Sequence, residues 1–162
     1  MWYRHVPRGK GVLRTPPIET DGRWQHGSVA TALYLADTPA TALAEWYRWL
    51  AESEIPPGNT LPRDLWSIEV DVEVADLSTA ERLEEWGLAR PEPDRQLWPS
   101  YQAVGERIWR DGWAGLIAPS AALPAGLVLC LFSLGTSMER VRPLASPHRW
   151  DELPPPPRGM RT

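Results

Sequence analysis

The chain has 162 residues, a mass of 18.3 kDa and a formal net charge of −4. Its length is that of one ordinary domain, and its content of 43% apolar and 23% charged residues is normal for a globular protein. The acidic balance lacks the basic excess that is typical of nucleic-acid-binding proteins, so we expect no direct contact with nucleic acid. The longest apolar run, residues 126–132, is too short to span a membrane, and we expect no membrane contact.

The cysteine and histidine content limits the chemistry further. The single cysteine, Cys130, excludes an internal disulfide and a zinc site built on several cysteines. The three histidines, His5, His26 and His148, show no ligand spacing, so we expect no metal. The N-terminus has no apolar signal-peptide core, and together with the lone cysteine this predicts a cytoplasmic protein.

The first half of the chain predicts two strands and a helix. A short strand is expected near Trp2–His5, within a Gly- and Pro-rich segment of residues 1–28, and a buried strand over residues 29–36. Asp37 or Thr38 can cap a following helix, with Pro39 at its first position. Apolar residues at helical spacing predict one buried face, formed by Leu43, Trp46, Tyr47 and Leu50. The helix should end before Pro56.

The second half predicts further strands and two helices. Alternation over residues 65–74 is typical of a half-buried strand, and a capping box at residues 78–81 predicts a short helix ending near Gly87. A third helix should run from about Pro99 to Arg110 and close at Gly112, with strands over residues 115–118, 126–133 and 139–143. We therefore predict an α+β domain over residues 1–150, with mixed or antiparallel sheets and short helices, and a Pro-rich tail over residues 151–162.

Several common catalytic patterns are absent. The sequence has no Gly-rich phosphate loop, no dinucleotide-binding fingerprint and no Gly-x-Ser-x-Gly motif, which argues against hydrolysis by a nucleophilic triad. Ten tryptophans and eighteen prolines are unusual, but tryptophan is more typical of cores and interfaces than of binding clefts. Candidate site residues must therefore be sought among isolated polar side chains.

Glu45 is the most informative of these side chains. It lies on the helix face opposite the predicted apolar face. One interpretation is a solvated carboxylate paired with Arg48 three residues later. The other is a ligand contact, because the neighbouring side chains are small enough to let a ligand approach: Ala40, Thr41, Ala42 and Ala44.

Other candidates also have two interpretations. Arg23 and Trp24 could clamp an anion and stack on a ring, or form a surface turn that Trp24 anchors. Ser120 could bind a ligand or cap a short turn. Tyr34 at a strand end is by default a core-edge aromatic, and Arg4 is uninformative by itself.

Taken in order, short motifs along residues 2–133 resemble the RES domain family: Tyr3-Arg4, Gly22-Arg23-Trp24 with Gly27, Tyr34-Leu35-Ala36, Ala42-Leu43-Ala44-Glu45 and Gly115-Leu116-Ile117-Ala118-Pro119-Ser120-Ala121. That family is named for an Arg, a Glu and a Ser, and Arg4, Glu45 and Ser120 fall at the matching places. The chain departs from the family by carrying Gln25 where Asn is usual, and residues 125–128 where Asn-rich residues are frequent.

The resemblance implies the toxin half of a RES–Xre type II toxin–antitoxin pair that degrades NAD⁺, with a fold similar to ADP-ribosyltransferase toxins. It implies NAD⁺ as substrate, no metal, and a protein partner, the Xre-type antitoxin, which would supply any DNA contact. An exposed apolar or Trp-bearing surface would suit that partner or self-association. The implied catalytic residues are Glu45, Arg4 and Ser120, and the implied substrate-binding residues are Tyr34, Arg23 and Trp24.

The implied reaction is cleavage of the nicotinamide–ribose bond, with water or inorganic phosphate as acceptor. Glu45 would stabilise positive charge on the ribose, and Arg4 would pair with the pyrophosphate or an incoming phosphate. Tyr34 would pack on the nicotinamide or ribose, and Ser120 would hydrogen-bond the ligand. Two alternatives stay open: an ADP-ribosyltransferase that modifies a macromolecule, and a non-catalytic, Trp-rich interaction module with a Pro-rich tail.

Overall fold

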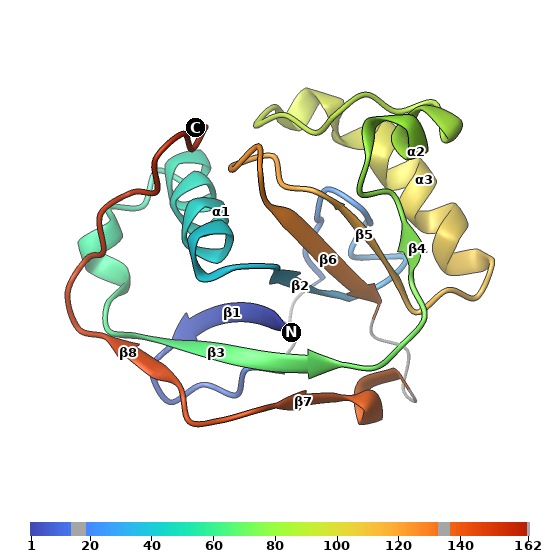
Figure 1. Ribbon diagram of the computed structural model, residues 1–162. Coiled ribbons are helices and arrows are strands. Elements are labelled where there is room, and N and C mark those ends of the chain that lie inside the picture. The colour runs from blue at the N-terminus through green and yellow to red at the C-terminus, as the bar shows by residue number, and fades with distance from the viewer. Residues whose placement is uncertain (14–18, 133–136, 162) are drawn as a thin grey trace.

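The computed structural model describes residues 1–13, 19–132 and 137–161, and places the strands of these segments in one mixed sheet (Figure 1). The strand order is β4-β5-β6-β2-β1-β3-β7, and β8 also pairs with β3. The β4–β5 pair is parallel and the other pairs are antiparallel. The strands are β1 (Trp2–Pro7), β2 (Ala32–Ala36), β3 (Arg63–Val70), β4 (Ala75–Asp76), β5 (Gly115–Pro119), β6 (Leu127–Phe132), β7 (Val141–Pro143) and β8 (His148–Trp150). The predicted α+β class is confirmed.

The helices follow the sequence signals closely. Helix α1 (Pro39–Glu52) is capped by Thr38, whose hydroxyl accepts from the Thr41 N–H at 3.0 Å, and Pro39 occupies its first turn as predicted. Helix α3 (Trp98–Arg110) is followed by Gly112 at a φ of 88°, the left-handed conformation that favours glycine. Short 3₁₀ turns complete the set: η1 (Pro57–Thr60), η2 (Arg95–Leu97) and η3 (Ser137–Arg140). No helix of the described segments is long and apolar enough to cross a membrane.

Several predicted boundaries are wrong. Helix α2 (Ala80–Glu85) is capped by Thr79 rather than Ser78, and β3 begins and ends earlier than the predicted 65–74. Strand partners set the limits of β3: its start pairs with β8, and its end pairs with β7. Strands β4 and β8 have no local sequence signal, because two or three residues are too few to show alternation. The predicted strand end at residue 133 lies outside the described residues.

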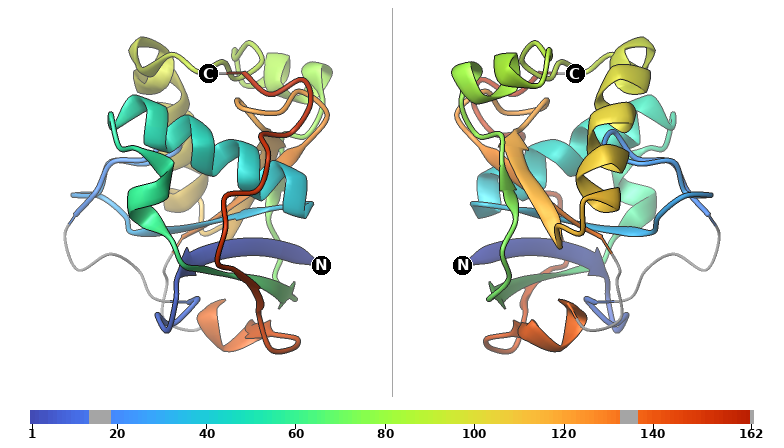
Figure 2. Two further views of the ribbon diagram at one scale, coloured as in Figure 1. Left: turned by 90° about the vertical axis from the view of Figure 1, so that its left-hand side faces the viewer. Right: turned by 90° about the vertical axis from the view of Figure 1, so that its right-hand side faces the viewer.

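The sheet is splayed between β1 and β2. These strands share a single paired position, Tyr3 with Ala36, whereas β1 and β3 pair over six positions. Figures 1 and 2 show the two halves of the sheet diverging from this junction. A buried apolar cluster joins the halves on one face: Val6, Val12, Leu33, Leu35, Ile68, Leu129, Leu131 and Val141.

The helices cover the other face of the sheet in two groups. Helix α1 packs on β1 and β2, and α3 packs on β5. Figure 1 shows α1 on one side, α2 and α3 on the other, and the turn between β5 and β6 reaching up between the two groups. This arrangement brings three separate parts of the chain to one place: the middle of α1, the β5–β6 turn, and the segment beneath α3.

Gly105 permits the closest helix contact in this arrangement. A Cβ at this position would lie 1.9 Å from the carbonyl oxygen of Trp24, a backbone atom that cannot give way cheaply. We expect Gly105→Ala to destabilise the protein by about 3 kcal/mol, although alanine in a helix is intrinsically better by about 1 kcal/mol. Urea denaturation measures the change, with Ala103→Gly on the exposed face of α3 as the propensity control. A stability gain in Gly105→Ala would contradict this packing.

His5 links β1 to α1 as a neutral side chain. Its Nε2 lies 3.1 Å from the carbonyl oxygen of Ala42, so it donates, and its Nδ1 accepts from Arg63 Nε at 2.8 Å. Burial first, and then the charge of Arg63, lower the pKa of His5 to about 3. The unfolded chain therefore binds a proton that the folded one does not between pH 6.5 and 3, and stability is lost as the pH falls through that window. We expect a slope of about 1 kcal/mol per pH unit, which His5→Gln should flatten in unfolding curves. An unchanged slope in that variant would place the effect on other groups.

Candidate active site

The centre of the site is a hydrogen-bonded pair, Glu45 on α1 and Ser120 after β5. The Ser120 hydroxyl donates to Glu45 Oε1 at 2.6 Å, across 75 positions of sequence. The Ala122 N–H lies 3.3 Å from the same oxygen. Ser120 is 1% exposed and the Glu45 side chain 23% exposed. The serine is therefore buried, and the glutamate beside it is partly accessible to solvent between the helix and the turn. The capping interpretation of Ser120 is confirmed, because its hydroxyl also accepts from the N–H groups of Ala122 and Leu123. A contact between Ser120 and a ligand stays a prediction.

Gly126 lets the turn approach α1 this closely. A Cβ at Gly126 would lie 2.3 Å from Thr41 Oγ1 on the first turn of α1. The Gly126 carbonyl accepts from the Ser120 N–H at 2.8 Å, which closes the turn around the serine. The sequence of this turn, Ser-Ala-Ala-Leu-Pro-Ala-Gly, is therefore suited to carrying Ser120 against the helix.

Arg48 holds the second oxygen of Glu45. Its Nε donates to Glu45 Oε2 at 3.0 Å, and its Nη1 pairs with Glu52 one turn further along. The Arg48 side chain is only 11% exposed, and its two carboxylate partners raise its pKa although burial alone would lower it. Arg95 on η2 also reaches Glu52, at 3.3 Å, and so links α1 to the α3 side of the site. The predicted Glu45–Arg48 contact is confirmed, but Glu45 is tied to the turn as well.

The segment beneath α3 is a rigid turn that presents Arg23. Gly22 and Gln25 form a bridge, with the Gly22 N–H donating to the Gln25 carbonyl at 2.9 Å. The Tyr34 hydroxyl accepts from the Trp24 N–H at 3.1 Å and donates to Gln25 Oε1 at 2.5 Å. A further donor from α3, the Gln102 side chain, reaches the Gly22 carbonyl at 2.9 Å. Gln25, the departure from the family pattern, is thus part of the support of this turn.

The guanidinium of Arg23 is buried beneath α3. The residue is 7% exposed, and neither Nη1 nor Nη2 has a partner within the described segments. It lies 5.8 Å from the ring centre of Trp98 and 5.4 Å from that of Tyr101. Burial, and then the charge of Arg48, lower its pKa, while Glu45 acts in the opposite direction. An unpaired buried cation is costly, so a structure that holds one rigidly is suited to receive an anion.

Tyr34 and Trp24 have supporting positions. Burial raises the pKa of the Tyr34 hydroxyl well above its usual range, so it stays a neutral donor. Trp24 is fully buried and packs edge-on against Tyr101 at 5.2 Å, which gives its ring a core role and confirms that it anchors the turn. The predicted surface location of this turn is wrong, because α3 covers it and Arg23, Trp24 and Gln25 are all buried. Cys130 lies beside Tyr34, and burial raises its pKa to about 12, so it is no thiolate nucleophile at neutral pH.

The structure places Arg4 apart from the Glu45–Ser120 pair. Strand neighbours alternate between faces: Tyr3 and His5 face α1, whereas Trp2 and Val6 belong to the cluster on the other face. Arg4 shares the face of Trp2 and Val6, and its guanidinium donates to the Val12 carbonyl. Burial lowers its pKa to about 10, so it remains charged at neutral pH.

Sequence reasoning missed several residues of the site. Trp98, Tyr101 and Gln102 come from α3, and no local motif in the sequence connects that helix with Arg23. The helical spacing of Arg48 and Glu52 behind Glu45 was the one signal that could have extended the prediction.

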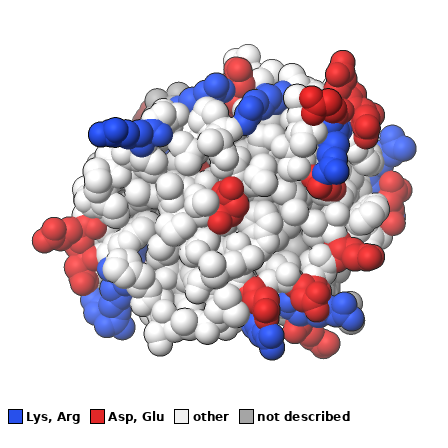
Figure 3. Space-filling model, in the orientation of Figure 1, with Lys and Arg blue, Asp and Glu red and all other residues white. Residues whose placement is uncertain are grey.

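The assembled groups can bind an anion and stabilise a cation side by side. Arg23 offers two free donor nitrogens, and Glu45 offers a carboxylate that Ser120 and Arg48 hold in a fixed orientation. Figure 3 shows that on this face the charged side chains lie mainly around the rim, with one acidic patch near the otherwise uncharged centre. Within the described ranges, no group of three or more His, Cys, Asp or Glu side chains is placed to hold a metal ion.

Comparison with known proteins agrees with this α+β fold. The chain matches a chain of the solved Mycobacterium tuberculosis MbcT–MbcA toxin–antitoxin complex with a TM-score of 0.75 and 24% identity, over 90% of this chain and 81% of that one. Three curated relatives, each named NAD(+) phosphorylase MbcT, come from Mycobacterium bovis and two strains of M. tuberculosis. Each is 30% identical over 144 residues, which covers 87% of this chain and 72% of the relative.

The curled mixed sheet with a glutamate–serine pair between two helices defines an α+β domain with a candidate active site. The RES domain profile matches residues 2–153, nearly the whole chain. This protein belongs to the RES domain family, as its short motifs predicted.

Proposed function

We propose that this chain degrades NAD⁺ by cleaving the bond between nicotinamide and ribose. The observation that carries the proposal is the Glu45 carboxylate, which Ser120 and Arg48 hold within electrostatic range of Arg23, whose two Nη atoms have no partner among the described residues. NAD⁺ needs both kinds of group: a carboxylate for the ribose and a cation for the phosphates. The naming of 30% identical relatives as NAD(+) phosphorylases supports this choice of substrate.

In the proposed reaction the bond from ribose C1′ to the nicotinamide nitrogen breaks, and its electron pair leaves with neutral nicotinamide. Because the leaving group is already cationic in NAD⁺, no general acid is required. Positive charge develops on the ribose, where Glu45 stabilises it or accepts a hydrogen bond from a ribose hydroxyl. An oxygen of phosphate, or of water after loss of a proton, then bonds to C1′.

The resemblance implied that Arg4 pairs with the phosphates and that Arg23 binds substrate, and we assign the phosphate role to Arg23. Its fork of donors is unpaired and rigidly placed near Glu45, whereas Arg4 donates to Val12 on the other face of β1. Tyr34 and Trp24 fix the Arg23 turn, and Ser120 orients Glu45. A contact between Arg4 and the pyrophosphate stays a prediction.

Product analysis tests the reaction and names the acceptor. The purified protein is incubated with NAD⁺ in phosphate and in a phosphate-free buffer, and products are separated by mass. We expect release of nicotinamide with either acceptor. The second product names the acceptor: ADP-ribose-1″-phosphate indicates phosphate and ADP-ribose indicates water. Label from adenylate-labelled NAD⁺ on a macromolecule would instead indicate an ADP-ribosyltransferase. NAD⁺ that stays intact in both buffers would favour a non-catalytic interaction module.

The proposal includes a cytoplasmic toxin that is paired with a protein antitoxin of the Xre type. Its support is the fold shared with a chain of the MbcT–MbcA toxin–antitoxin complex. Growth of cells that express the chain tests it: we expect arrest with falling cellular NAD⁺, and recovery when the cognate antitoxin is co-expressed. Normal growth with a folded, active protein would contradict the toxin role. Self-association stays a prediction that size-exclusion chromatography can measure.

A further inference from the structure

The Pro-rich tail does not extend away from the domain. After β8 it crosses α1 and finishes beside the β5–β6 turn, as Figures 1 and 2 show. The RES domain profile ends at residue 153, so residues 154–161, here called the strap, lie outside the family match. They are nevertheless in contact with two elements that build the candidate site.

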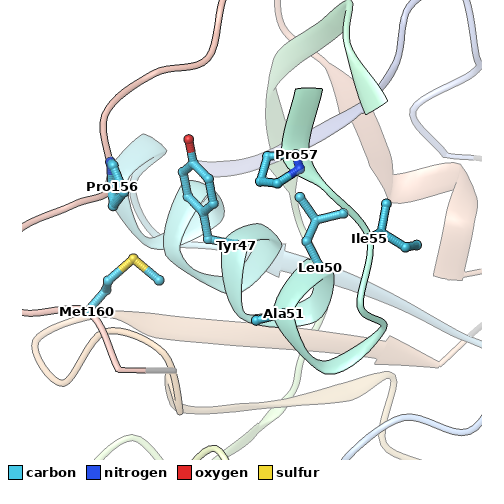
Figure 4. Close-up of a pocket in the computed structure, with 7 residues that line it drawn as sticks. All are labelled: Tyr47, Leu50, Ala51, Ile55, Pro57, Pro156 and Met160. Atoms are coloured by element: carbon cyan, nitrogen blue, oxygen red, sulfur yellow. The ribbon is translucent and has the colours of Figure 1, made fainter. Parts of the chain in front are cut away.

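The first anchor of the strap is α1. The Tyr47 hydroxyl, on the helix that carries Glu45, donates to the Pro154 carbonyl. Pro156 and Met160 face this helix across an apolar cavity of about 370 Å³, which Tyr47, Leu50, Ala51, Ile55 and Pro57 also line (Figure 4). Four consecutive prolines pre-extend the strap, so that little chain entropy is lost when it lies along the helix.

The second anchor is the turn that carries Ser120. The Met160 N–H closes a turn onto the Pro157 carbonyl at 3.3 Å, with Gly159 at a φ of 77°. The following N–H, of Arg161, donates to the Ala122 carbonyl at 2.7 Å. Ala122 is the residue whose own N–H lies 3.1 Å from Ser120 Oγ and 3.3 Å from Glu45 Oε1. One residue thus connects the strap to the glutamate–serine pair.

We propose that the strap is a positioning element, which fixes the Ser120–Ala122 turn against Glu45 through the Arg161 N–H. This inference rests on the proposed function only for its effect on catalysis. A hydrogen bond on the Ala122 carbonyl restricts the peptide unit that also carries the Leu123 N–H, which donates to Ser120 Oγ at 2.9 Å. Restriction of a turn that supplies donors to a carboxylate keeps those donors aligned before substrate arrives.

Two proline substitutions separate this role from a general effect on the tail. Arg161→Pro removes the N–H that Ala122 accepts. Arg158→Pro is the matched control, since position 158 precedes Gly159 in a turn whose geometry favours proline there. Tyr47→Phe loosens the other anchor and serves as a second variant.

Hydrogen exchange of the Ala122 and Leu123 amides is the first readout, and it needs no NAD⁺ turnover. We expect exchange about fivefold faster in Arg161→Pro, the size of one net hydrogen bond, and wild-type exchange in Arg158→Pro. On NAD⁺, kcat should fall by a similar factor with KM and melting temperature unchanged. Wild-type exchange in Arg161→Pro would contradict the proposal that the strap restricts the Ser120–Ala122 turn. Faster exchange in Arg161→Pro with a wild-type kcat would contradict the role of the strap in catalysis. If the wild-type protein does not consume NAD⁺, the proposed function is contradicted, and the exchange result still tests the strap.

Discussion

Glu45→Gln is expected to lower the rate of NAD⁺ cleavage by about 1,000-fold, the loss typical of removing one preorganised electrostatic contact from a transition state. Glutamine keeps the size of the side chain and an oxygen that can accept from Ser120, but removes the charge that stabilises a cationic ribose. Arg48 retains Glu52 as an ion-pair partner, so the helix should stay folded. Initial rates of nicotinamide release measure the effect.

The matched control is Glu85→Gln, the same change at an exposed glutamate on α2. It should leave the rate of NAD⁺ cleavage unchanged. Circular dichroism and the melting temperature of both variants establish that each is folded. Wild-type turnover by folded Glu45→Gln would remove Glu45 from the mechanism.

Arg23→Met is expected to move activity and stability in opposite directions. Loss of the cation to which we assign the phosphates of NAD⁺ should lower kcat/KM for NAD⁺ by about 100-fold. The same change removes a buried guanidinium whose Nη atoms lack a partner, which should raise the free energy of unfolding by about 1 kcal/mol or more. Steady-state kinetics and urea denaturation measure the two effects.

Arg107→Met, on the exposed face of α3, is the control for this prediction, because its side chain is 70% exposed. Neither its kcat/KM nor its stability should change by more than a small amount. A drop in stability of Arg23→Met would show that the guanidinium has a structural partner. Normal kinetics in Arg23→Met, with loss of activity in Arg4→Lys, would return the phosphate contact to Arg4.

The sequence signals for the fold were local, and they were sufficient where an element is long. The Thr38 cap with Pro39 and the apolar spacing of Leu43, Trp46 and Leu50 placed α1 correctly, because each feature acts within a few residues. The short strands β4 and β8 exist only through their partners, so nothing local could reveal them. The ends of β3 are likewise set by pairing with β7 and β8.

In the candidate site, too, local features could be predicted from the sequence, and contacts between distant segments could not. Helical spacing predicted the contact between Glu45 and Arg48, and motif order placed Ser120 among the site residues. The geometry that joins them depends on Gly126 against Thr41, a contact between distant segments. The burial of Arg23 beneath Trp98 and Tyr101, and the placement of Arg4 on the opposite face of β1, also depend on how the sheet and helices pack. No spacing within a single sequence encodes such contacts.

Consumption of NAD⁺ at the Glu45 site is the basis of the proposed function. The most direct test is the amount of NAD⁺ remaining over time with purified, folded protein in phosphate buffer, measured beside the nicotinamide released. We expect the amount of NAD⁺ to fall and that of nicotinamide to rise by an equal amount. Constant NAD⁺, in a sample that circular dichroism shows to be folded, would contradict it.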